Sequence, residues 1–169
     1  MSVETAERNT LFSYDVNYTD LDLDSVTFFD NTTLFNITSE GIINFTPSTI
    51  GNITVNITLG QDTNVSDIMT IEVKDTLPPV ITSIGPSYSG TTTVTVTLSV
   101  TTDENATCRF TTSNSSLNYS SMIDQMSTTN STSHSHSQSF ISDTSGTYYV
   151  RCNDTIGNVM NYSSSTAFN

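Results

Sequence analysis

The clearest structural pattern in the sequence is the stretch Gly51-Asn52-Ile53-Thr54-Val55-Asn56-Ile57-Thr58-Leu59-Gly60. Its apolar residues alternate with Asn and Thr, and this period of two predicts a β-strand with one face on a core. The other face carries two asparagines, each followed two positions later by Thr. Asn-x-Ser/Thr is the acceptor pattern for N-glycosylation. The segment therefore predicts a buried apolar face and an outward face where sugars cost no packing.

The same alternation extends to both sides of this stretch. Further strands are predicted at 11–19, 25–29, 34–37, 42–45 and 68–74, and then at 80–84, 92–100, 106–112, 135–141, 146–153 and 163–168. A turn is predicted at Gly85-Pro86, and Met122 and Met126, four apart, predict a helical turn over 121–126. Many short strands with no long helical pattern are typical of β-sandwiches.

The run Asp75-Thr76-Leu77-Pro78-Pro79 separates two groups of strands. Paired prolines fix φ and favour an extended connector. We therefore predict an all-β protein of two tandem β-sandwich domains, 1–75 with an N-terminal extension and 76–169, joined by a short Pro-rich linker.

The composition excludes several classes of function. Ser and Thr supply 58 of the 169 residues, and four basic residues face 17 acidic ones, for a net charge of -13. Nucleic acid is nearly excluded as a partner, because binding it requires clustered Lys and Arg. An anionic membrane surface is disfavoured for the same reason. We expect no membrane span, because no stretch approaches about 20 apolar residues.

The Asn-x-Ser/Thr acceptor patterns are the strongest indication of the compartment in which the protein is found. They occur at Asn17, Asn31, Asn36, Asn44, Asn52, Asn56, Asn64, Asn105, Asn114, Asn118, Asn130, Asn153 and Asn161, which are 13 of 16 asparagines. With a third of residues Ser or Thr, chance gives roughly a third of the asparagines such a follower. The excess predicts a secreted, heavily N-glycosylated surface protein. The alternative is a Ser/Thr/Asn-rich surface that is never glycosylated.

The two cysteines, Cys108 and Cys152, share the parity of the apolar residues in their own predicted strands. In an extracellular protein this predicts one buried disulfide, closing a loop of about 45 residues and stabilising the domain by about 2–4 kcal/mol. Two unpaired buried thiols are the alternative.

Two groups of motifs resemble known families. The first consists of Phe12-Ser13-Tyr14-Asp15-Val16, 19–28, 35–37, 41–47 and 71–73, and it resembles the cadherin-like modules of large microbial surface proteins. The second consists of 75–79, 102–110 and 146–158, with Asp154, Gly157 and Asn158 at its end, and it resembles the Ig-like repeats of bacterial and archaeal surface proteins. The resemblance implies a cadherin-like domain, then an Ig-like domain, in a spacer, stalk, adhesin or filament.

Two sets of acidic residues are candidate calcium ligands. Asp20, Asp22 and Asp24 alternate, and three carboxylates on one face suit a hard cation with oxygen ligands. A solvated acidic turn is the alternative. The second set, Asp75, Asp103 or Glu104, Asp154 and Asn158, is one that the resembled repeats sometimes use to hold calcium at a domain junction. We expect no other cofactor.

The histidines give no case for catalysis. His134 and His136 share a strand face but lack a third zinc ligand, and we expect exposed polar side chains there. Neither lies beside a nucleophile motif, and there is no Gly-rich phosphate loop. We therefore predict that the protein is not an enzyme.

The prediction that combines these observations is a structural subunit of an extracellular filament or surface layer, from an archaeon-like microbe. Its partners are copies of itself or neighbouring surface modules. We expect strand donation to the next subunit by a segment within residues 1–12 or by the C-terminal strand near Ala167. The rival prediction is an adhesin whose loops, such as 113–137, bind a glycan or a protein.

Overall fold

The computed structural model describes residues 2–19, 26–60, 65–90, 93–141 and 144–169. The chain divides into two compact units, Met1–Thr76 and Leu77–Asn169, one residue after the expected boundary. The regular structure that it describes is β-strand apart from one short 3-10 turn. The prediction of an all-β protein is therefore confirmed.

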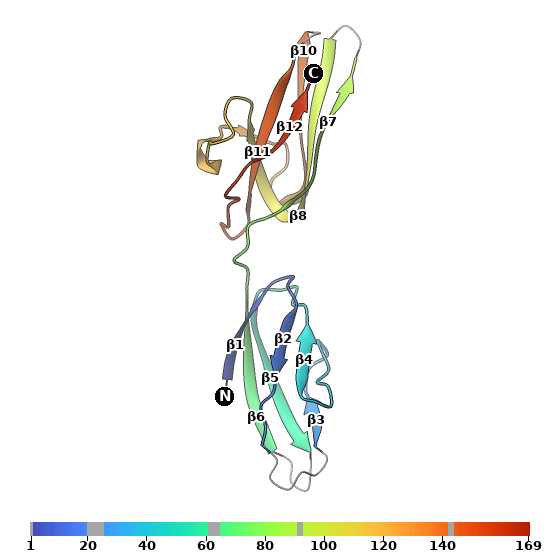
Figure 1. Ribbon diagram of the computed structural model, residues 1–169, viewed down its shortest axis with the longest axis vertical. Coiled ribbons are helices and arrows are strands. Elements are labelled where there is room, and N and C mark those ends of the chain that lie inside the picture. The colour runs from blue at the N-terminus through green and yellow to red at the C-terminus, as the bar shows by residue number, and fades with distance from the viewer. Residues whose placement is uncertain (1, 20–25, 61–64, 91–92, 142–143) are drawn as a thin grey trace. The chain divides into compact units, whose positions relative to one another are not determined.

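The first unit contains two sheets facing a common core (Figure 1). Its strands are β1 (Ser2–Glu7), β2 (Phe12–Asp15), β3 (Thr27–Asp30), β4 (Ile42–Phe45), β5 (Gly51–Gly60) and β6 (Val65–Lys74). The larger sheet has the order β1-β6-β5-β3, with β1 parallel to β6 and the other pairs antiparallel. The smaller sheet is β2-β4. In β5, Val55 and Ile57 are buried while Asn52 and Asn56 are exposed, as the alternation predicts.

The N-terminal segment is not free. It forms β1, which pairs with β6 along its whole length, from Ser2 opposite Met69 to Glu7 opposite Lys74. Ala6 enters the core, and Glu7 accepts hydrogen bonds from both the backbone N–H and the hydroxyl of Thr76. The expectation of an unpaired N-terminal extension is therefore wrong, because an open β6 edge is available within the same unit.

One predicted strand of the first unit does not form. Residues 34–37 make only the isolated bridge between Ile37 and Ile43, although Phe35 is buried in the core. The chain turns just before, where the Asp30 carboxylate accepts from the Thr32 N–H and the Thr32 hydroxyl accepts from the Leu34 N–H. These local side-chain bonds compete with ladder formation.

The second unit is organised around one long strand. It contains β7 (Ile81–Ser89), β8 (Thr93–Thr111), a 3-10 turn η1 (Tyr119–Ser121), β9 (Asp124–Gln125), β10 (Ser131–Ile141), β11 (Gly146–Asp154) and β12 (Ser164–Phe168). The first half of β8 pairs with β7 and β10, and its second half pairs with β9 and β11, which in turn pairs with β12. Figure 1 shows β8 running the length of this unit.

The predicted strands at 92–100 and 106–112 are thus one strand. The register of β10 against β8 shifts between Ser131 and Ser133, from Ala106 to Thr101, so the intervening residues of β8 bulge. At this bulge the Thr102 hydroxyl donates to the carbonyl of Glu104. A bulge re-aims a strand without ending it, so β8 continues through the register shift and pairs with different neighbours in its two halves.

Two other local expectations are wrong. Gly85-Pro86 is no turn, because both residues lie within β7, a sheet-edge strand where the missing N–H of proline is tolerated. Residues 121–126 are not helical, because the helical turn ends at Ser121 and β9 follows. Met122 and Met126 are nevertheless both buried.

Hydroxyl side chains cover the outer face of the β7, β8 and β10 part of the second unit. Thr95 pairs with Ser139 and Thr97 with Ser137, and their hydroxyls are 3.0 Å and 2.8 Å apart. On the inner face of β8, Val96, Leu98 and Val100 are buried. The abundant Ser and Thr therefore occupy the outward positions of core strands.

Candidate functional site

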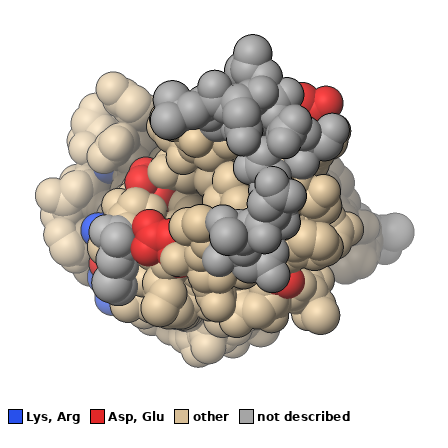
Figure 2. Space-filling view, turned by 90° about the horizontal axis from the view of Figure 1, so that it is seen from below, with Lys and Arg blue, Asp and Glu red and all other residues tan. Residues whose placement is uncertain are grey.

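The candidate glycosylation acceptors lie on the surface. Of the 13 acceptor asparagines, Asn64 falls outside the described residues, and 11 of the other 12 are exposed. The exposed set is Asn17, Asn31, Asn36, Asn44, Asn52, Asn56, Asn105, Asn114, Asn118, Asn130 and Asn161. Among the described residues on the face shown in Figure 2, uncharged side chains predominate over Asp, Glu, Lys and Arg.

Three acceptors have side chains fixed by local hydrogen bonds through Oδ1. Asn31 accepts from the Asn56 N–H, Asn114 from the Ser116 N–H, and Asn118 from the Ser121 N–H and the Ser120 hydroxyl. Asn118 thereby caps η1. A sugar would attach to the other side-chain atom, Nδ2, so these bonds orient the asparagine without occupying the atom that is modified.

Asn153 is the exception. It is half-buried on β11, and its Oδ1 is buried without a hydrogen-bond partner. We expect the lowest sugar occupancy of the described acceptors at Asn153, because a bulky sugar there would displace packed neighbours. Site-by-site mass spectrometry of the glycosylated protein measures this, with exposed Asn161 as the matched acceptor in the same unit. Equal occupancy at the two positions would contradict the expectation.

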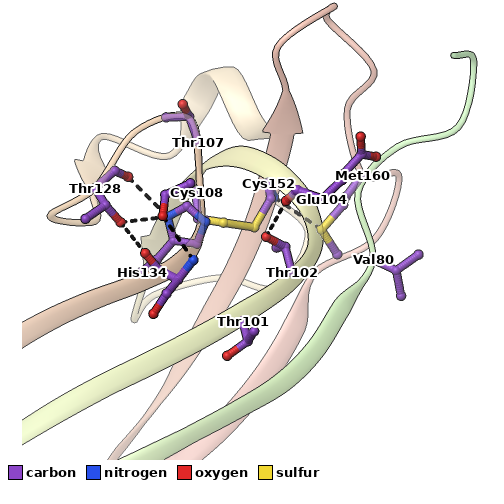
Figure 3. Close-up of a disulfide and its surroundings, with 12 residues drawn as sticks. Val80, Thr101, Thr102, Glu104, Thr107, Cys108, Thr128, His134, Cys152 and Met160 are labelled. Atoms are coloured by element: carbon purple, nitrogen blue, oxygen red, sulfur yellow. Dashed lines mark hydrogen bonds between the residues drawn. A yellow bond between two sulfur atoms is a disulfide. The ribbon is translucent and has the colours of Figure 1, made fainter. Parts of the chain in front are cut away.

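The predicted disulfide is present. Cys108 on β8 and Cys152 on β11 are directly opposite in the antiparallel register, with Cα atoms 4.1 Å apart, and both side chains are fully buried. The two cysteines do not hydrogen-bond each other through the backbone, because the Cys108 carbonyl accepts from the Met126 N–H and the Cys152 carbonyl accepts from the Met160 N–H. The two cysteines form a non-hydrogen-bonded pair, where opposite residues approach most closely. The bond therefore lies within one sheet (Figure 3).

The histidines contradict the sequence-based expectation. His134 is only 2% exposed, and its Nδ1 lies 3.1 Å from both the hydroxyl and the carbonyl oxygen of Thr128. Figure 3 shows the ring beside Cys108. His136 packs against Phe110, with ring centroids 4.4 Å apart. They share a face, as predicted, but it is the inward face of β10.

Asp154 organises the loop that follows β11. Its Oδ1 accepts from the N–H groups of Ile156, Gly157 and Asn158 at 2.7–2.8 Å, and its Oδ2 accepts from the Asn158 side-chain amide at 2.7 Å. Gly157 has φ of 111°, which favours glycine. The Asp-x-x-Gly-Asn motif is thus a carboxylate-closed turn.

Hydrogen bonds to the Asp154 carboxylate lower the pKa of this carboxyl group. Burial raises the pKa of this carboxyl, but the bonds from Asn158, Ile156 and Gly157 outweigh burial, and the net pKa is lowered. Asp154 therefore contributes stability above its unfolded pKa of about 3.9, and this is lost as the pH falls through the lower folded pKa.

Replacing Asp154 by Ala should lower the free energy of unfolding of the second unit by about 1–3 kcal/mol at pH 7. The difference from wild type should shrink below about pH 4, where the wild-type carboxyl protonates in the unfolded and then the folded chain. Urea denaturation at pH 7 and at acid pH measures both. Asp124→Ala, at an exposed position on β9, is the control and should have little effect. A pH-independent difference would contradict this account.

The candidate calcium ligands belong to several segments of the chain. Asp20, Asp22 and Asp24 lie outside the described residues. Asp75 belongs to the first unit, where it is buried and forms an ion pair with Arg8 at 2.7 Å. In the second unit, carboxylate oxygens of Glu104 and Asp154 lie within 4.8 Å of each other. Calcium binding by either set remains a proposal.

Sequence reasoning missed an arginine pair. Arg109 on β8 and Arg151 on β11 are directly opposite in the register, on the face away from the disulfide. A signal was available, because each arginine is the sequence neighbour of a cysteine. Once an antiparallel pairing of Cys108 with Cys152 is assumed, the arginines must also be opposite.

No known protein family and no curated protein matches the chain. The chain is similar to several solved structures. A chimeric titin Z1Z2 is 15% identical over 98% of this chain and 90% of its own, with a TM-score of 0.38. The fibronectin(III)-like modules of Clostridium thermocellum CbhA are 12% identical over 98% and 88%, with a TM-score of 0.36.

The Down Syndrome Cell Adhesion Molecule, in a structure of eight Ig domains, is 9% identical over 99% of this chain and 26% of its own, with a TM-score of 0.43. At these values we draw no functional conclusion from the likeness. In the described part of the chain, no helix has the length and apolar character needed to span a membrane.

Proposed function

We propose that this chain is a non-enzymatic structural subunit of an N-glycosylated extracellular filament or cell-surface layer. The observation that carries the proposal is the placement of 11 acceptor asparagines on the exposed surface of two all-β units. The buried disulfide supports an oxidising, extracellular compartment. Sugars at these positions would shield the surface and supply the solubility that charged side chains supply elsewhere.

In this proposal the loops carry sugars that shield the protein surface and do not form a binding site for a partner. The loop region 113–137, the candidate for an adhesin site, contains the exposed acceptors Asn114, Asn118 and Asn130. Sugars there would cover the loop. Calcium at the acidic sets would stiffen the protein in this proposal but is not required by it.

Polymerisation by exchange of β1 is the assembly mode that we propose. β1 lies at a sheet edge, and Ala6 is the one buried side chain of this strand, so β1 contributes little to the core. The C-terminal strand β12 is held more tightly, because Phe168 is buried against Tyr148 and Phe140. Exchanging an identical strand replaces each bond to β6 with an equivalent bond in a neighbour, so the cost is low.

Disulfide trapping tests this exchange. Val3 and Thr70 are register partners on β1 and β6, so Val3→Cys with Thr70→Cys places two thiols for bonding. Oxidation before assembly should lock β1 onto its own β6 and keep the chain monomeric. Oxidation after assembly should join position 3 of one copy to position 70 of the next and give a ladder of multimers on a non-reducing gel.

The matched control is Ser87→Cys with Thr97→Cys, which are register partners on β7 and β8. The disulfide between these two cysteines should form only within one chain, whether oxidation comes before or after assembly. Filaments built from the locked Val3/Thr70 variant would exclude exchange of β1, and the remaining proposal would then be association through intact surfaces.

A further inference from the structure

Two of the chain's four basic residues lie side by side on the outer face of one sheet. Arg109 on β8 and Arg151 on β11 are direct register partners, and residues in such a pair project to the same face. Like charges in this arrangement destabilise a sheet unless a counter-charge is present. In a chain of net charge -13, such a placement calls for an explanation.

Arg109 is held in place by the segment around η1. Its guanidinium carbon lies 4.8 Å from the ring centroid of Tyr119, and Nη1 donates to the carbonyl of Met122 at 3.4 Å. The Met122 side chain is fully buried. The Nε group of Arg109 is buried and has no hydrogen-bond partner, so this donor is left available in an environment where an unpaired donor is costly.

Arg151 is more deeply enclosed. It is only 9% exposed, and Nε donates to the Ser163 hydroxyl at 3.3 Å. The Ser163 hydroxyl in turn donates to the Ser115 carbonyl at 2.7 Å, which joins the segment after β11 to the segment before η1. An arginine this buried is ordinarily paired with an anion.

Neither guanidinium has an anionic partner within the described ranges. The other two bases do, since Arg8 pairs with Asp75 and Lys74 with Glu72. Asp124 lies on β9, which pairs with β8 at Arg109 and Phe110, but it is exposed and forms no ion pair with either arginine. In the described part of the chain, no carboxylate therefore compensates these two guanidinium charges.

We propose that Arg109 and Arg151 bind the carboxylate or sulfate group of an acidic sugar. Three exposed acceptors lie close in sequence to residues that contact the arginines directly or through Ser163: Asn114 precedes Ser115, Asn118 precedes Tyr119, and Asn161 lies two residues before Ser163. Tyr162, the sequence neighbour of Ser163, is 84% exposed. Guanidinium groups suit planar carboxylate and tetrahedral sulfate oxygens.

The test uses the full chain produced without glycosylation. It is titrated with sodium glucuronate, glucose 6-sulfate or neutral glucose at constant ionic strength. Binding is followed by NMR of the arginine Nε–H signals. Both acidic sugars should shift the signals of Arg109 and Arg151, and glucose should not. Arg151→Gln and Arg109→Gln should each weaken binding about tenfold or more, because each removes a charge-assisted bond. Lys74→Gln, at a surface ion pair in the first unit, should leave binding unchanged. Circular dichroism checks that each variant is folded.

A second arm identifies the source of the sugar; this arm and the choice of a sugar as the ligand rest on the proposed glycosylation, whereas anion binding by the arginines does not. If the chain's own glycans fill the site, added glucuronate should not shift the arginine signals of the glycosylated protein until its glycans are removed. If a partner supplies the sugar, both forms should bind. The proposal is overturned if glucose shifts the arginine signals as much as the acidic sugars do, if neither acidic sugar shifts them, or if the folded variants bind as wild type does.

Discussion

Replacing Cys108 and Cys152 together with Ala should lower the free energy of unfolding of the second unit by about 2–4 kcal/mol. The bond closes a separation of 44 residues, and its loss frees the unfolded chain from that constraint. Both cysteines are fully buried between core side chains such as Val150 and Phe110, so the variant also loses packing. Urea or thermal unfolding followed by circular dichroism measures the change.

The first unit provides an internal control for this experiment, because it has its own core and no cysteine. Its unfolding, followed by the NMR signals of its two tyrosines, Tyr14 and Tyr18, should be unchanged in the double variant. An unchanged stability of the second unit would show that register pairing on β8 and β11 alone holds this sheet together.

Phe168→Ala should destabilise the second unit by about 3–4 kcal/mol, although Phe168 is one residue from the end of the sequence given. The side chain is 5% exposed and packs on Tyr148 and Phe140, with ring centroids 4.7 Å and 5.2 Å away. Its ring also fills the space beside Gly146, where an added Cβ would approach within 2.7 Å. Removing the ring therefore leaves a cavity that a rigid strand cannot close.

The matched control for Phe168 is Ala167→Ser, at an exposed position of the same strand. It should change the stability by less than about 0.5 kcal/mol. Chemical denaturation of the two variants gives the comparison. A small effect of Phe168→Ala would mean that β12 is loosely attached and would restore it as a candidate for exchange between subunits.

The outward and inward faces of the strands could be predicted from sequence, because a period of two leaves one assignment of faces. Val55 and Ile57 enter the core, and Asn52 and Asn56 face outward, as expected. The disulfide followed from the same parity. The prediction of a strand at 34–37 was wrong because side-chain hydrogen bonds at Asp30 and Thr32 turn the chain. The alternation of apolar and polar residues does not reveal such bonds.

Pairing between distant segments could not be predicted in the same way. Nothing in Ser2–Glu7 indicates that it lies parallel to β6, because its inward positions are only Ser2, Glu4 and Ala6. Likewise, one strand and a bulge replace the two strands expected around Thr102, and the registers of β7 and β10 against β8 both shift at this point. The burial of His134 depends on Thr128, which reaches it from another segment.

Electron microscopy of the native protein tests whether the chain is a glycosylated subunit that assembles. We expect regular filaments or a continuous layer built from repeating subunits, with extra density over the exposed acceptor asparagines. Isolated particles with a bare protein surface would show that the chain neither assembles nor carries these sugars.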